Sequence, residues 1–234
     1  MAQKSDDNHG SYGPPVDRLL AIGSPDRGEP WPECPDEYGL TLEHVPELLH
    51  MVQDEDLNLA DEDSDEVWAP LHAWRALGQL QAEAAVEGLL SVLYMIDDSG
   101  DDWMMEEMPV VLGEIGPAAI AALAEYIADA GNGEFARITA ARALSEVGQR
   151  HPQARDRCVA VLSKQLAHYR RQDDLYNAFL ISYLVDLKAV EAATIMEEAF
   201  AADRVELQVQ GDWEDVQISL GLLKQRLTSR PRWG

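Results

Sequence analysis

Apolar residues recur along most of the chain at the spacing of an amphipathic helix. One clear example is the set Leu42, Val45, Leu48, Leu49 and Val52. Residues three or four positions apart lie on the same face of an α-helix, so this set predicts a helix with one buried face. No segment alternates apolar and polar residues over the length of a strand. We therefore expect an all-α fold.

From residue 64 onward the helical pattern repeats. A short tetrad that ends one apolar helix recurs at Leu77–Leu80, Leu112–Ile115, Leu144–Val147 and Leu184–Leu187. A second apolar helix follows each tetrad, over residues 84–95, 117–130, 153–169 and 190–202. A lone helical hairpin cannot bury its apolar face, whereas stacked hairpins share a continuous core. We predict an α-solenoid of stacked helical hairpins over residues 64–228, with about five repeats and a last helix near residues 216–227.

The region before the repeats is expected to be a degenerate N-terminal capping unit over residues 16–63. A short helix at 16–22 precedes a loop at 23–40, where the density of proline and glycine argues against any regular element. Thr41 is expected to cap the next helix. His44 stands where a capping box has Glu or Gln, so we expect no full box. Tails are expected at both ends of the chain, a disordered one over residues 1–15 and a short one over residues 229–234.

Two segments carry a family resemblance. The stronger is Ala136–Gly148, which reads Ala-Arg-Ile-Thr-Ala-Ala-Arg-Ala-Leu-Ser-Glu-Val-Gly, and the second is Val67–Leu90. They resemble HEAT-like repeats, in particular the short repeats named after phycobilisome lyases, and the resemblance covers about residues 64–228. It departs from that family at 81–83 and 188–189, where the Gly-Asp-Pro-type turn is absent. The resemblance implies an α-solenoid scaffold and, as an alternative, a subunit of a chromophore lyase that attaches a bilin to a phycobiliprotein.

The chain is strongly acidic, with 18 Lys and Arg against 43 Asp and Glu and a net charge of −25. This charge argues against nucleic acid and anionic membranes as partners, and it favours a protein with a basic or mixed surface. No apolar run is long enough for a transmembrane helix, and no apolar segment near the N-terminus indicates a secretory signal. Because only two cysteines are present, we expect a reducing, cytoplasmic location.

One segment, residues 150–171, inverts this charge. It holds one acid, Asp156, and the cations Arg150, Arg155, Arg157, Lys164, Arg170 and Arg171. Two pairings would neutralise this basic patch. Acids on neighbouring helices, such as Glu191, Glu197 and Glu198, would do so within the molecule. Acidic residues 54–66 of a second copy would do so between molecules and give a salt-sensitive homodimer.

No arrangement of residues meets the spacing that catalysis or metal binding requires. Asp54 and Asp56 resemble the first ligands of a calcium loop, but Leu59 stands where that loop needs glycine. His151 and Cys158 are seven residues apart, which is about 10 Å along a helix and too far for proton transfer. We therefore predict no catalytic residue, no metal and no cofactor. The expected function is that of a non-enzymatic scaffold or adaptor, with an obligate homodimer as a further alternative.

Two groups of residues are candidate partner contacts. Trp68, His72 and Arg75 share a helix face and are of the types enriched in interface hot spots. Packing of that face against the preceding acidic unit is the interpretation we favour. The second group contains the aromatic residue at the start of each first helix, namely Trp68, Trp103, Phe135, Tyr176 and Trp213. These residues either attach each repeat to the one before it, which we favour, or form an exposed binding edge.

Overall fold

The computed structural model describes residues 12–25, 30–61 and 63–229. These residues form helices and connecting segments without a strand, so the all-α prediction is confirmed. The chain divides into two compact units, Met1–Leu93 and Tyr94–Gly234. The predicted tails fall outside the described residues, apart from positions 12–15 and 229.

The first unit is organised around one buried helix, α4. The elements of this unit are η1 (Val16–Ala21), α1 (Cys34–Tyr38), η2 (Leu42–His44), α2 (Val45–Gln53), α3 (Glu55–Asn58), η3 (Glu66–Trp68), α4 (Ala69–Gln79), η4 (Glu83–Ala85) and α5 (Val86–Ser91), where η denotes a 3₁₀ helix. Helix α4 packs against α2, α1 and η1. Every residue from Ala69 to Gly78 is buried, because neighbours cover this helix on all sides rather than along one stripe.

Two expectations for the N-terminal region were wrong. The segment 23–40 contains a short helix, α1. Pro35 lies in its first turn, where a missing amide hydrogen costs nothing, and Gly39 ends it in the left-handed conformation at φ 75°. A full capping box is also present, because the His44 ring replaces the expected Glu: its Nδ1 accepts a hydrogen bond from the Thr41 amide at 2.9 Å.

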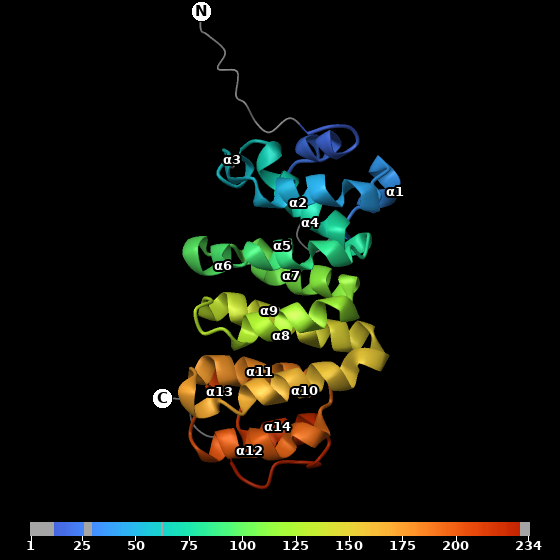
Figure 1. The fold of residues 1–234 in the computed structure, drawn as a ribbon. Coiled ribbons are helices and arrows are strands. Elements are labelled where there is room, and N and C mark those ends of the chain that lie inside the picture. The colour runs from blue at the N-terminus through green and yellow to red at the C-terminus, as the bar shows by residue number, and fades with distance from the viewer. Residues whose placement is uncertain (1–11, 26–29, 62, 230–234) are drawn as a thin grey trace, which may run out of the picture. The chain divides into compact units, whose positions relative to one another are not determined.

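The second unit contains pairs of helices in two rows. Its elements are α6 (Tyr94–Ser99), α7 (Asp102–Ile115), η5 (Pro117–Ala119), α8 (Ile120–Ala128), α9 (Glu134–Arg150), η6 (Pro152–Ala154), α10 (Arg155–Leu166), η7 (Tyr169–Arg171), α11 (Asp174–Asp186), η8 (Val190–Ala192), α12 (Ala193–Ala201), α13 (Leu207–Gln210) and α14 (Trp213–Ser219). Helix α9 packs against α7 and α11, while α10 packs against α8 and α12 (Figure 1). The first and second helices of successive pairs therefore each contact their counterparts within this unit.

The turns between paired helices follow a common pattern. A 3₁₀ helix opens the second member of the pair at η4, η5, η6 and η8. In three of these turns a residue with positive φ precedes the 3₁₀ helix: Gly116, at φ 86°, stands directly before η5, while Gln81, at φ 50°, and Lys188, at φ 52°, stand two residues before η4 and η8. At the two turns without a Gly-Asp-Pro-type sequence, Gln81 and Lys188 thus adopt a positive φ that is more usual for glycine.

Two predicted helices differ from the structure. The helix expected over 84–95 is instead α5 and α6, and the boundary between the two units falls between them, after Leu93. The last helix was expected near 216–227, but α14 begins earlier, at Trp213, and ends at Ser219. It begins there because Asp212 and Asp215 form a capping box.

None of the helices in the described part of the chain is alone long and apolar enough to cross a bilayer. The segments Asp102–Ile115 and Pro117–Ala128 reach that length and composition only together, and they are bent by 106° relative to each other.

Candidate functional site

His72 and Arg75 of α4 are covered within the first unit, and Trp68, at the end of η3, is partly buried. His72 Nε2 lies 2.8 Å from the Gly23 carbonyl oxygen, and the Arg75 guanidinium lies 5.0 Å from the centre of the Trp31 ring. His72 and Arg75 are only 1% and 3% exposed. The loop before α1 covers His72 and Arg75 within this unit, so neither side chain is available to a partner.

The aromatic residues of the second unit do not form one exposed edge. Tyr176 is buried, and its hydroxyl donates a hydrogen bond to the Ile127 carbonyl at 3.3 Å. Trp213 is partly buried against Phe200, with ring centres 5.9 Å apart, and Trp103 is partly buried as well. Phe135 is the exposed member, at 43%.

Two cations of the basic patch are paired within the molecule. Arg150 lies 3.4 Å from Glu146 and 3.9 Å from Glu114. Arg155 lies 2.8 Å from both Asp156 and Glu191. The hydrogen bond from Arg155 holds the pKa of Glu191 below its usual range.

The other four cations of this patch have no acidic partner among the described residues. The Arg170 guanidinium lies 5.0 Å from the centre of the Tyr169 ring. Arg157, Lys164 and Arg171 are exposed, and no described carboxylate lies within ion-pair distance of them. Of the three acids named in the sequence analysis, Glu191 alone pairs with the patch; Glu197 and Glu198 are exposed and do not.

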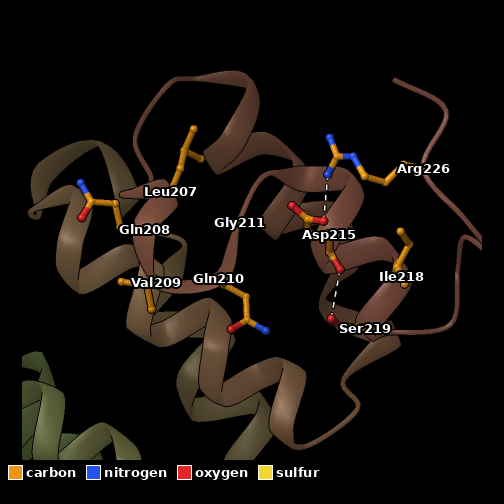
Figure 2. A pocket seen from close by; sticks show the side chains of 9 residues that line it. All are labelled: Leu207, Gln208, Val209, Gln210, Gly211, Asp215, Ile218, Ser219 and Arg226. Carbon is orange, nitrogen blue, oxygen red and sulfur yellow. Dashed lines mark hydrogen bonds and ion pairs between the residues drawn. The ribbon is translucent and has the colours of Figure 1, made fainter. Parts of the chain in front are cut away.

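Helices α13 and α14 border an open hollow of about 810 Å³ (Figure 2). Its charged groups already have partners: Arg226 Nη1 lies 2.8 Å from Asp215 Oδ1, and Arg226 also binds both carboxylate oxygens of Asp212. The Gln210 side chain accepts a hydrogen bond from Ser182 at 3.3 Å. This hollow therefore presents few free polar groups to a ligand.

A second hollow, of about 490 Å³, lies in the second unit beside α8 and α10. We call it the cationic hollow, because its lining includes Arg137, Lys164, His168 and Arg171 against a single acid, Asp173. Ala124, Ile127, Ala128 and Val161 supply apolar lining. Arg137 and His168 were not among the residues predicted from the sequence. Residues 164, 168 and 171 recur at helical spacing, and this pattern could have indicated His168.

The residues tested for chemistry have structural roles. Cys158 is fully buried, and burial raises the pKa of its thiol to about 11, so it is not poised as a nucleophile. His151 Nε2 lies 3.0 Å from the Gly113 carbonyl oxygen at the end of α7. Asp54 caps α3 and accepts a hydrogen bond from the Tyr12 hydroxyl at 2.6 Å. The described residues contain no group of three His, Cys, Asp or Glu placed to hold a metal ion.

A run of exposed acids in the first unit follows α2. We call it the acidic segment, residues 55–65, of which 62 is outside the described residues. Exposed acids in it are Glu55, Asp56, Asp61, Asp63 and Asp65. None of them forms an ion pair with a described residue. Leu59 lies among them and is 83% exposed.

Comparison with known proteins returns no matching family model, and neither a curated protein nor a solved structure matches the chain. The resemblance to HEAT-like repeats stays a prediction from the repeat pattern.

Proposed function

We propose that this protein is a non-enzymatic, cytoplasmic protein-binding scaffold, an α-solenoid whose acidic segment docks a basic surface of another protein. The observation that carries the proposal is the exposure of Leu59, 83%, among five exposed acids that lack described ion-pair partners. An apolar side chain surrounded by uncompensated charge of one sign is the arrangement of a small interface with an apolar centre and a charged rim.

The arrangement of helices in the second unit supports the solenoid part of the proposal. Helix α9 contacts its counterparts α7 and α11, and α10 contacts α8 and α12. Helical pairs that stack in this way bury a shared core and leave an extended surface for a partner. The chemistry of the described residues fits a binding role, since Cys158 is buried and His151 caps a helix end.

The test is affinity capture from cells of the source organism with four forms of the full chain: the wild type, a docking variant, a control variant and Leu59→Ser. The docking variant carries Glu55→Lys, Asp56→Lys and Asp63→Lys. The control variant carries Glu125→Lys, Glu197→Lys and Glu198→Lys, which changes the net charge equally on exposed residues of the second unit. Melting curves verify that all four forms are folded.

We expect the wild type and the control variant to capture a basic protein at low salt. The docking variant should not capture it. Reversal of three charges should weaken its binding about tenfold or more. Leu59→Ser should weaken binding also at high salt, because the apolar contact is not screened. Equal capture by the wild type and the docking variant would exclude the acidic segment as the docking surface.

A second candidate is a homodimer in which the acidic segment of one copy meets the basic patch of another. It is favoured by the exposure of Arg157, Lys164 and Arg171 without described acidic partners. Sedimentation at low and high salt tests it. A dimer that dissociates at about 0.5 M salt supports this assembly, and a mass independent of salt excludes it.

A further inference from the structure

The cationic hollow is basic in a protein of net charge −25. Three cationic side chains line its 490 Å³, against one acid, Asp173. The volume lies in the range of small-molecule sites, about 300–1,000 Å³. The positive charge of this hollow therefore needs an explanation of its own, separate from that of the acidic surface.

Arg137 is the fixed member of this lining. Its Nε and Nη2 both donate hydrogen bonds to the Ile127 carbonyl, at 3.0 and 2.9 Å. The guanidinium also lies over the Tyr176 ring, 4.3 Å from the ring centre. These bonds use two of the five N–H donors of the guanidinium. The charge is thus held in one place by the fold, with donor capacity left over.

Lys164 and Arg171 are the adaptable members. Both are exposed, and no described carboxylate pairs with either. Asp173, which lines the same hollow, forms no ion pair with any cation of the described residues. An anion that enters would meet three cations from α9, α10 and η7, and it would gain charge-assisted hydrogen bonds that no described side chain supplies.

The apolar residues of the lining favour a ligand that also has an apolar part. Ile127 and Val161 contribute hydrocarbon surface beside the cations. A bare inorganic anion would leave this surface in contact with water, whereas a ligand with an apolar body would cover it. We propose that the cationic hollow binds a small organic anion, a phosphate monoester or carboxylate attached to an apolar group.

The experiment uses the full chain and phenyl phosphate as the probe, in a calorimetric titration at low salt. Inorganic phosphate and benzyl alcohol are the reference ligands, since each has one half of the proposed chemistry. The site variant is Lys164→Gln with Arg171→Gln. The control is Arg157→Gln, which removes one positive charge from α10; Arg157 is exposed, does not line the hollow and has no described acidic partner. Both changes affect exposed side chains, so the fold is retained.

The expected result is saturable binding of phenyl phosphate that is tighter than that of inorganic phosphate, with no binding of benzyl alcohol. The site variant should bind phenyl phosphate at least about tenfold more weakly, because two charge-assisted contacts are lost, and Arg157→Gln should bind as the wild type does. Absence of binding up to millimolar probe would overturn the proposal, as would equal weakening in the control. Binding of a synthetic peptide of residues 54–66 in place of phenyl phosphate would also overturn it and would favour the homodimer.

Discussion

The carboxylate of Asp97 in α6 accepts a hydrogen bond from the backbone amide of Phe135, at 2.9 Å, across 38 positions of sequence. Its second oxygen accepts from the Ala136 amide at 2.8 Å. Helix α9 begins after Gly133, which has no side chain to cap it. One helix therefore supplies the N-terminal cap of another, and this contact fixes α6 against the first turn of α9.

Removal of this cap should destabilise the second unit. Asp97→Ala leaves two amides at the helix start without their acceptor, and we expect a loss of about 1–2 kcal/mol in the free energy of unfolding. Urea unfolding followed by circular dichroism measures it. Asp98→Ala is the matched control, because Asp98 is exposed and makes no described side-chain contact.

Gly133 should be required for the same contact. A Cβ added at this residue would overlap the carboxylate of Asp97. Gly133→Ala should therefore destabilise the wild type but cost less in the Asp97→Ala background, where the obstructing carboxylate is gone. Additive effects of the two substitutions would show that the cap and the glycine act independently, contrary to this prediction.

Arg155 is expected to stabilise the junction between α10 and the end of α11. Its guanidinium donates to the carbonyls of Leu187 and Lys188 at 2.8 and 3.0 Å, and it pairs with Glu191. Arg155→Met should cost about 1–3 kcal/mol, because helix-end carbonyls lose a charged donor. Thermal unfolding of Arg155→Met beside Arg157→Met, an exposed neighbour, tests this. Equal stability of the two variants would contradict it.

Gln81 offers a stabilising substitution. Its φ of 50° lies in the left-handed region, where a side chain is strained and glycine is not. Gln81 is exposed, so its replacement removes no buried contact. Gln81→Gly should gain up to about 1 kcal/mol after the greater unfolded-state entropy of glycine is counted. Glu87→Gly, in the right-handed helix α5, should instead lose about 1 kcal/mol, as measured by chemical unfolding.

The features predicted best from the sequence are the helix ends that depend on a local pattern of residues. Helices α4, α7 and α11 end within one residue of the end of their tetrads, which are short-range signals, whereas α9 continues past its tetrad to Arg150. The helix α1 was missed because proline density was read as breaking helices, although Pro35 in a first turn is permitted. The last helix was predicted to extend to residue 227 because of apolar residues such as Leu222 and Leu227, but these are exposed and lie beyond the end of α14 at Ser219.

The candidate sites depended on contacts between distant residues, which a pattern does not contain. His72 and Arg75 have the composition of a hot spot, but Gly23 and Trp31 of a preceding loop cover them. The basic patch was visible as a charge run, yet only the fold shows that Arg155 is paired and Lys164 is not. Arg137 joins the cationic hollow from another helix, 27 residues before Lys164 in the chain.

The pairing of Arg226 with Asp212 should make the stability of the C-terminal region depend on acid pH. Hydrogen bonds from Arg226 hold the pKa of Asp212 below its usual range, although partial burial opposes the shift. A carboxyl whose pKa is lowered by folding stabilises the native state above the unfolded pKa of about 3.9. This stabilisation is lost as the pH falls through the lower native value.

Arg226→Gln should therefore lower the melting temperature most at neutral pH, and the difference from the wild type should shrink below about pH 4. The physical reason is that a protonated Asp212 is no longer stabilised by the charge of the guanidinium, so removal of the guanidinium costs less stability. Melting curves of both proteins between neutral and acid pH provide the measurement, with Arg157→Gln as a control for the loss of one exposed positive charge. A difference that stays constant through this range would show that Arg226 acts through its contact with the backbone carbonyl of Thr228, at 3.3 Å, and not through the carboxylate of Asp212.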